Sequence, residues 1–200
     1  MDRTAFVLKL TGDRAAGVAA VKAMEKDFAA AGLDNFSIWH MAQYLFGYGE
    51  SESAYAGQLD AAFAKLPEGV ELVCAPGTMR QMYHDIGIVR EDKSLIRHRV
   101  FATKLKPNCE DEYKRRHDGL IEARGDTVKE GPESNFTIWC GDGHIFGYCE
   151  LVKAFDHEPT PEEHAATVAW ETRQLEIMDW LTDDVDWLTG EKHPAVERVI

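Results

Sequence analysis

NFSIWHMAQYLFGYGE, at residues 35–50, returns 100 residues later as NFTIWCGDGHIFGYCE, at residues 135–150. Eight of the sixteen aligned positions are identical, whereas unrelated segments of average composition would share about one. Two related segments of this length predict two copies of one supersecondary unit in the chain. We therefore expect a pseudo-dimer within one chain, and the sequence leaves its further association open.

Composition limits the classes of partner. The 200-residue chain carries a formal net charge of −13 and has no run of Lys or Arg longer than three residues. This balance argues against nucleic acids and membrane surfaces, which are themselves negative, and favours a neutral small molecule. The four cysteines show no metal-finger spacing, Met1-Asp2-Arg3 opens no signal peptide, and no apolar stretch is long enough to span a bilayer. We therefore expect a soluble, cytoplasmic protein.

Each half begins with the pattern of a strand followed by a helix. Alternating apolar residues at 5–10 and 100–105 predict the strands. The first helix is expected from about residue 13 to 31, and the second from Pro107-Asn108 to about residue 124. The repeated segment then predicts a β-hairpin, which in the second half turns at Asp142-Gly143.

The ends of the two halves are predicted by capping and break signals. Thr160-Pro161-Glu162-Glu163 predicts the start of a helix that continues to about Thr182, and residues 195–200 are expected to form the strand that closes the second sheet. In the first half, we expect a helix near 55–65 and a closing strand at 86–90.

The resulting order, βαββαβ in each half, is that of the ferredoxin-like fold, a four-stranded antiparallel sheet with both helices on one face. Because the other face needs a partner, the sequence predicts an α+β fold in which two ferredoxin-like repeats form one intrachain dimeric α+β barrel. The predicted domains are residues 1–92 and 97–200, with a linker at 92–94.

Alternation along the second hairpin divides its residues between two faces. We assign the face that matches the first half, which includes Trp139 and Tyr148, to the barrel interior. The other face, with Phe136, Ile138 and Gly147, is expected to lie under the helices, where small residues leave room for a pocket.

The helix above that pocket carries polar residues on its inner face. Tyr113, His117, Leu120 and Arg124 have helical spacing, so a tyrosine and a histidine occupy a stripe that would otherwise be aliphatic. Two readings are open: an acid/base pair, or buried core residues whose polar atoms bind backbone carbonyls. The first-half helix has no tyrosine or histidine on its face, so we expect a site in the second half alone and none in residues 1–92.

The second half resembles the L-rhamnose mutarotase family of cofactor-free sugar epimerases. The resemblance rests on Lys106-Pro107-Asn108, on residues 112–117 (EYKRRH), on Asn135-Phe136-Thr137-Ile138-Trp139 and on residues 146–150 (FGYCE). It implies a dimeric α+β barrel and the interconversion of the α and β anomers of a reducing sugar. It also implies that His117 is the principal acid/base and that Tyr113 hydrogen-bonds the sugar near the reacting oxygens.

The resemblance also suggests substrate-binding residues. Phe136 stands where the family usually has a sugar-binding tyrosine, and Gln174 and Leu175 align with a tryptophan pair that stacks on the sugar. Trp170 and Trp180 lie nearby in the sequence, and Arg116 can orient either reacting group. The predicted substrate-binding residues are therefore Phe136, Arg116, Trp170 and Gln174, and the sugar, L-rhamnose or a related monosaccharide, is left open.

Two other functions stay open at this point: a non-catalytic sugar- or metabolite-binding protein, and another cofactor-free enzyme, such as a monooxygenase or a different isomerase, on the same barrel. No cofactor is expected. The remaining histidines form no H-x-H or H-x-x-x-H pair on one predicted element, so no metal site is expected either.

Overall fold

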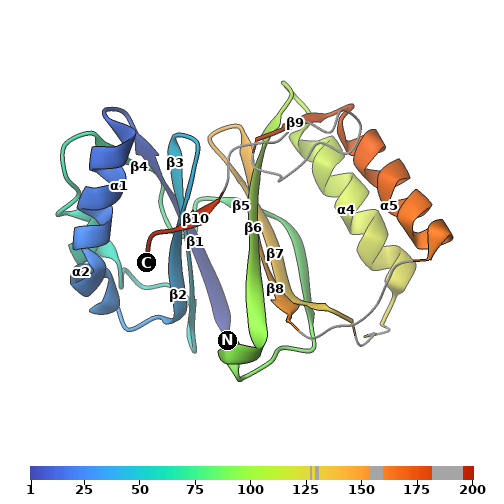
Figure 1. Ribbon diagram of the computed structural model, residues 1–200, viewed down its shortest axis with the longest axis horizontal. Helices are drawn as coiled ribbons and strands as arrows, with labels where there is room; N and C mark the ends of the chain where they lie inside the picture. Colours follow the sequence, from blue (N-terminus) through green and yellow to red (C-terminus); the bar gives the residue numbers. More distant parts are fainter. Residues whose placement is uncertain (127, 129–130, 154–159, 182–195) are drawn as a thin grey trace. The chain divides into compact units, whose positions relative to one another are not determined.

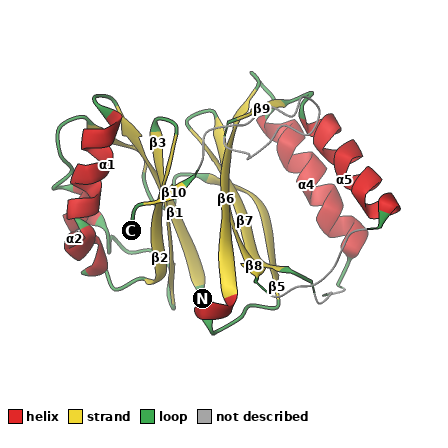
Figure 2. Cartoon of the chain, viewed as in Figure 1, coloured by secondary structure: helices red, strands yellow, loops and turns green. Residues whose placement is uncertain are grey.

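The computed structural model describes residues 1–126, 128, 131–153, 160–181 and 196–200. These residues form two compact units. The first contains Met1–Arg80 with residues 196–200, and the second contains the described residues from 81 to 181. The chain is α+β, and each unit holds one five-stranded sheet (Figure 1 and Figure 2).

In the first unit the sheet order is β10-β2-β3-β1-β4, with helices on one of its faces (Figure 1). Its elements are β1 (Asp2–Leu10), α1 (Arg14–Ala23), α2 (Glu25–Ala29), β2 (Asp34–Met41), β3 (Tyr44–Ser51), α3 (Asp60–Phe63), β4 (Val70–Cys74) and β10 (Glu197–Arg198).

In the second unit the sheet order is β5-β7-β8-β6-β9, and α4 and α5 cover one face of it (Figure 2). Its elements are β5 (Arg80–Gly87), η1 (Lys93–Leu95), β6 (Ile96–Leu105), α4 (Glu110–Arg124), β7 (Glu133–Gly141), β8 (His144–Val152), α5 (Pro161–Gln174) and β9 (Met178–Trp180). The short helix η1 occupies the segment predicted as the linker.

Four strands of each sheet have the order expected of a ferredoxin-like unit, β2-β3-β1-β4 in the first and β7-β8-β6-β9 in the second. The fifth strands were assigned to the wrong sheets. The strand expected at 86–90 overlaps β5 only at residues 86 and 87, and β5 lies beside β7 in the second sheet. The C-terminal strand β10 pairs with β2 in the first sheet, with Glu197 opposite His40. Residue 195, where this strand was expected to begin, lies outside the described residues.

The closing strands also differ from the prediction. The first sheet closes with β4, directly after Pro67-Glu68-Gly69. In the second, α5 ends at Gln174 and β9 follows, where a helix was expected to continue to residue 182, which itself lies outside the described residues. The physical reason is Lys106: its Nζ donates to the carbonyl of Leu175 at 2.6 Å and its main-chain N–H to that of Ile177 at 2.9 Å. These bonds hold the turn at residues 175–177 beside the end of β6, and β9 then pairs with β6.

The helix starts agree with their capping signals. Thr160 and Glu163 form a reciprocal capping box at the start of α5, with Pro161 as the first helical residue. The predicted helix 13–31 is interrupted at Met24 and forms α1 and α2. The first of these is capped by Asp13, whose side chain accepts a hydrogen bond from the main chain of Ala16 at 2.9 Å.

The repeated residues form the same local structure in both sheets. Asn35 and Asn135 adopt left-handed φ angles of 46° and 51° at the point where the register of the hairpin shifts. Asn135 donates to Oε1 of Glu150 at 3.1 Å, and the Tyr148 hydroxyl donates to the same atom at 3.1 Å. Asn35, Glu50 and Tyr48 make the equivalent bonds, at 2.9 and 2.6 Å.

This network explains part of the repeat. An asparagine tolerates a positive φ better than most residues, and a buried carboxylate needs donors. In the second unit Lys93 adds two bonds of 2.8 Å to Glu150, which is fully buried. At the second hairpin, Asp142 and Gly143 have φ values of 50° and 71°, which confirms the expected turn.

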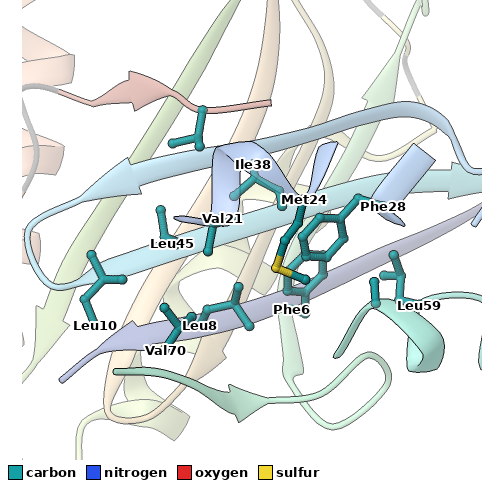
Figure 3. Close-up of a cluster of buried hydrophobic side chains, with 12 residues drawn as sticks. Phe6, Leu8, Leu10, Val21, Met24, Phe28, Ile38, Leu45, Leu59 and Val70 are labelled. Atoms are coloured by element: carbon teal, nitrogen blue, oxygen red, sulfur yellow. The ribbon is translucent and has the colours of Figure 1, made fainter. Parts of the chain in front are cut away.

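The two units differ in what fills the space between sheet and helices. In the first, Phe6 packs against Phe28, Phe36 and Phe63, with ring centroids 5.1–6.3 Å apart. Leu8, Leu10 and Val21 belong to the same buried cluster (Figure 3). In the second unit, the residues assigned to the helix-facing side of the hairpin, including Phe136, Ile138 and Cys140, pack in one cluster with Tyr113 of α4, as expected.

Candidate active site

Helix α4 presents the predicted pair to the interior of the second unit. It starts after Asn108, which has a φ of 61°, and three acidic residues in its first turn match the positive end of the helix dipole. Tyr113 and His117 are both buried. The helical spacing of Tyr113 and His117 therefore predicted correctly that both side chains lie on the inner face of α4.

A cavity of about 320 Å³ lies beside these two residues. Side chains from α4, from α5 and from four strands of the sheet line it. They are Tyr83, Arg99, Phe101, Tyr113, His117, Leu120, Glu133, Phe136, Ile138, Thr167, Trp170, Glu171, Gln174, Met178 and Trp180. Its volume is at the lower end of the range for small-molecule pockets, about 300–1,000 Å³.

The His117 imidazole is surrounded by aromatic rings. Its ring centroid lies 4.2 Å from that of Tyr113 in a stacked arrangement, 5.4 Å from that of Trp170 and 5.5 Å from that of Tyr83. Burial lowers the pKa of His117 from its ordinary 6.5 to about 4, against the opposing effect of a hydrogen bond from Nδ1 to the Tyr113 main chain. The ring is therefore neutral at pH 7.

The same hydrogen bond assigns the tautomer. The Nδ1 atom lies 2.9 Å from the Tyr113 main-chain oxygen, and a carbonyl can only accept. Nδ1 must therefore carry the proton in the neutral ring, which leaves the lone pair on Nε2. His117 therefore has a feature of each hypothesis. Nδ1 donates to a backbone carbonyl, as expected of a buried core histidine, and Nε2 can still act as a base.

Tyr113 stays protonated beside it. Burial raises the pKa of its hydroxyl far above the usual value, and the nearby Glu171 carboxylate adds to the shift. The hydroxyl is consequently a hydrogen-bond donor over the whole physiological range, and a poor source of a fully transferred proton.

Gln174 contributes an amide with no partner. The residue is only 1 % exposed, and neither Oε1 nor Nε2 makes a hydrogen bond within the part of the chain that the structure describes. A buried unpaired amide destabilises a fold by about 1–3 kcal/mol per lost bond, unless a ligand or water supplies the partner. An unpaired amide at a cavity wall is what a hydroxylated ligand requires.

Five of the six predicted site residues line this cavity, and Arg116 does not. Its Nε donates to Glu112 at 2.7 Å and its Nη2 to Glu176 at 2.8 Å, while Nη1 donates to the carbonyl of Arg173. The guanidinium therefore connects α4 to the C-terminal end of α5. Arg116 is not among the residues that line the cavity.

Sequence reasoning missed five polar side chains in the cavity wall: Tyr83, Arg99, Glu133, Thr167 and Glu171. Glu171 shares the spacing of Thr167, Trp170 and Gln174 on one face of α5, which was a usable signal. Tyr83 had none, because its strand was assigned to the other half. Its hydroxyl, 3.4 Å from Oδ2 of Asp85, has its pKa raised to about 12, chiefly by burial.

The described residues contain neither a candidate metal site nor a candidate membrane-spanning helix. Within the described ranges, no three His, Cys, Asp or Glu side chains gather closely enough to hold a metal ion. Among the described helices, none is both long and apolar enough to cross a membrane.

The cavity of this α+β unit is thus lined by a neutral histidine, a protonated tyrosine and an amide that has no partner among the described residues. The model of one family, described as L-rhamnose mutarotase, matches residues 98–199. The match covers half of the chain, which therefore belongs to the L-rhamnose mutarotase family. A search of curated proteins found no match, and a search of solved structures found none either.

Proposed function

We propose that this protein is a cofactor-independent isomerase that interconverts the α and β anomers of a reducing monosaccharide, L-rhamnose or a related sugar. The observation that carries the proposal is the state of His117: a neutral imidazole with a protonated Nδ1 and a free lone pair on Nε2, at the wall of a cavity of about 320 Å³. Membership of the L-rhamnose mutarotase family supports the same reaction.

The reaction needs one proton to move between two oxygens on the same carbon. Nε2 of His117 removes the proton of the anomeric hydroxyl while the C–O bond to the ring oxygen breaks, and the resulting imidazolium delivers that proton to the ring oxygen. Rotation about the bond next to the aldehyde then presents its other face, and the reverse steps close the ring. The buried surroundings favour the neutral imidazole, which drives the proton back to the sugar after each transfer.

The other cavity residues hold the sugar. The Tyr113 hydroxyl donates a hydrogen bond to the reacting oxygens and stays protonated throughout. The Gln174 amide offers one acceptor and two donors to sugar hydroxyls, and Trp170 and Phe136 supply ring faces for the apolar side of the sugar. Phe136 and Gln174 replace the tyrosine and one of the tryptophans that the family resemblance implies, which is why the sugar need not be L-rhamnose.

One observation favours a second candidate, a non-catalytic sugar-binding protein. A histidine whose pKa is lowered to about 4 is a weaker base than an ordinary imidazole, and general-base efficiency rises with basicity. In that case the same cavity would bind a sugar through Gln174 and Trp170 without accelerating exchange.

The two candidates are separated by NMR saturation transfer between the anomers of a sugar panel that includes L-rhamnose, L-fucose, D-glucose and D-galactose. We expect the protein to accelerate anomer exchange for at least one of them. Binding detected by calorimetry without any accelerated exchange would refute the isomerase and support the binding protein.

We also propose that the two units are tandem repeats that form one intrachain α+β barrel in the cytoplasm, with the site in the second unit only. The common order of four strands in each sheet and the shared Asn–Glu–Tyr network support the repeat. Phe6 and the three phenylalanines packed around it, Phe28, Phe36 and Phe63, fill the space that is a cavity in the second unit, which supports the absence of a site in residues 1–92.

A further inference from the structure

A second, smaller cavity adjoins the first in the same unit. Its volume is about 190 Å³, and it lies between the end of α4, β5 and the start of β7. Tyr83, Glu133 and Phe136 line both cavities, so these three side chains form the boundary between them. Apart from the shared Phe136, the proposed isomerisation of a monosaccharide uses no side chain that lines this second space.

The volume decides what the second cavity can hold. Pockets that bind a complete small molecule usually measure about 300–1,000 Å³, and a volume of about 190 Å³ falls below that range. Because the cavity shares a wall with a larger one, it is suited to one part of a ligand whose other part occupies the site of His117.

The helix geometry gives the distance that such a ligand must span. Arg124, in the wall of the second cavity, lies seven residues after His117 on the same face of α4. Seven residues correspond to about 10.5 Å along a helix. Two linked pyranose rings span this distance, and a single ring does not.

The charges of the second cavity favour a neutral ligand. Arg124 is paired with Asp85, with Nη1 2.5 Å from Oδ1, and Glu133 lies 3.5 Å from Arg99. Because Asp85 and Glu133 already neutralise the two guanidinium groups, an anionic substituent such as a phosphate gains no net attraction. Hydroxyl groups are different, because they can donate to carboxylates and accept from a guanidinium at once.

One donor in this wall has no partner. The Nε atom of Arg124 is buried and makes no hydrogen bond within the described residues, although its Nη1 is engaged by Asp85. The Tyr83 and Phe136 rings stand edge to face, with their centroids 5.2 Å apart, and supply apolar surface to the same cavity. A wall that combines a guanidinium with aromatic rings is suited to a hydroxylated ring.

We infer that the second cavity is a subsite for a second sugar ring, so that the substrate class is reducing disaccharides, with the reducing ring at His117 and the non-reducing ring at Arg124. This inference rests on the proposed function for the reaction at the reducing ring. It goes beyond that function by assigning the non-reducing ring of the substrate to the second cavity.

The test compares reducing disaccharides (maltose, cellobiose and rhamnobiose) with glucose and L-rhamnose, by anomer exchange and by calorimetric binding. For at least one disaccharide we expect kcat/KM about tenfold above that of the sugar at its reducing end, the effect of one or two hydrogen bonds. Arg124→Met should lower this preference about tenfold. Arg115→Met, which removes an exposed arginine of the same helix, should leave it unchanged.

The double variant Asp85→Asn/Arg124→Met removes both charges, so a loss of preference there is not due to an unpaired Asp85. If no disaccharide is bound or turned over better than its own reducing sugar, or if both arginine variants lower the preference equally, the subsite is refuted. If disaccharides bind about tenfold more tightly than monosaccharides but no sugar is isomerised, the subsite stands and the proposed isomerase fails.

Discussion

Nδ1 of His117 lies 2.9 Å from the main-chain oxygen of Tyr113, one turn earlier in α4. Because the acceptor is the main-chain carbonyl of Tyr113 in the same helix, the helix fixes the orientation and the tautomer of the His117 imidazole. Burial then keeps the ring neutral, with its pKa at about 4. The chemistry proposed for this protein follows from these two effects on one imidazole.

Gln174→Leu should separate stability from binding. Because leucine removes a buried amide that has no partner in the described structure, we expect the free energy of unfolding to rise by about 1 kcal/mol. Sugar affinity should fall about tenfold, since the amide is proposed to bind hydroxyls. Urea unfolding and calorimetric titration measure the two effects. The control is Gln81→Leu, which changes an exposed glutamine outside the cavity. A lower free energy of unfolding in Gln174→Leu would show that the amide has a structural role instead.

Two glycines at equivalent positions should respond differently to alanine. A Cβ at Gly47 would lie 2.1 Å from the ring of Phe6, and one at Gly147 would lie 2.3 Å from that of Phe101. The Phe6 ring is held by other phenylalanines, whereas Phe101 borders the cavity and can move into it. We expect Gly47→Ala to cost about 3 kcal/mol and Gly147→Ala about 1 kcal/mol, the latter with a loss of sugar affinity.

Gly119→Ala is the matched control for this pair. A Cβ at Gly119, exposed in the interior of α4, meets no atom within 4 Å. Alanine there should stabilise the protein by about 0.5–1 kcal/mol. Equal losses for the two buried glycines, measured by urea unfolding, would mean that Phe101 is as tightly held as Phe6.

Arg116→Met should lower stability and leave sugar recognition in place. The guanidinium ties α4 to the carbonyl of Arg173 and to Glu176, so its loss should cost about 1–2 kcal/mol. Arg115→Met, on the exposed side of the same turn, should cost less than about 0.5 kcal/mol. A fall in sugar affinity without a fall in the unfolding midpoint would restore Arg116 to the binding site.

The lowered pKa of His117 predicts a pH-dependent stability. The unfolded histidine binds a proton below about pH 6.5, while the folded one does so only below about pH 4. Between these values the unfolded state holds more protons, so stability is lost as the pH falls, by up to about 3 kcal/mol from this group. His117→Gln should lack this component in urea unfolding between pH 4 and 7. Parallel curves for the two proteins would contradict the shift.

Local sequence signals predicted the elements that depend on neighbouring residues. The Asp142-Gly143 turn, the capping box at Thr160 and the inward face of α4 all have such signals, and all are found as expected. No such signal says to which sheet the fifth strand belongs. Strands β5 and β10 are placed by pairing with strands far away in the sequence, and no local pattern names the partner.

The same reason explains the incomplete site. Tyr83 reaches the His117 ring only because β5 lies in the second sheet, so an error in strand assignment hid a cavity residue. Arg116 was misplaced for another reason. Its neighbours Tyr113 and His117 face the cavity, but a residue one position before His117 points about 100° away around the helix, toward α5.

His117 is proposed to move the proton in anomer exchange. NMR saturation transfer, with the sugar that the wild-type protein isomerises fastest, compares the exchange rate of wild type with those of His117→Ala and of His164→Ala, an exposed histidine of α5. We predict that His117→Ala lowers the exchange rate about 10²–10⁴-fold, with the fold intact by circular dichroism, and that His164→Ala leaves it unchanged. Exchange at the wild-type rate in His117→Ala would contradict the mechanism.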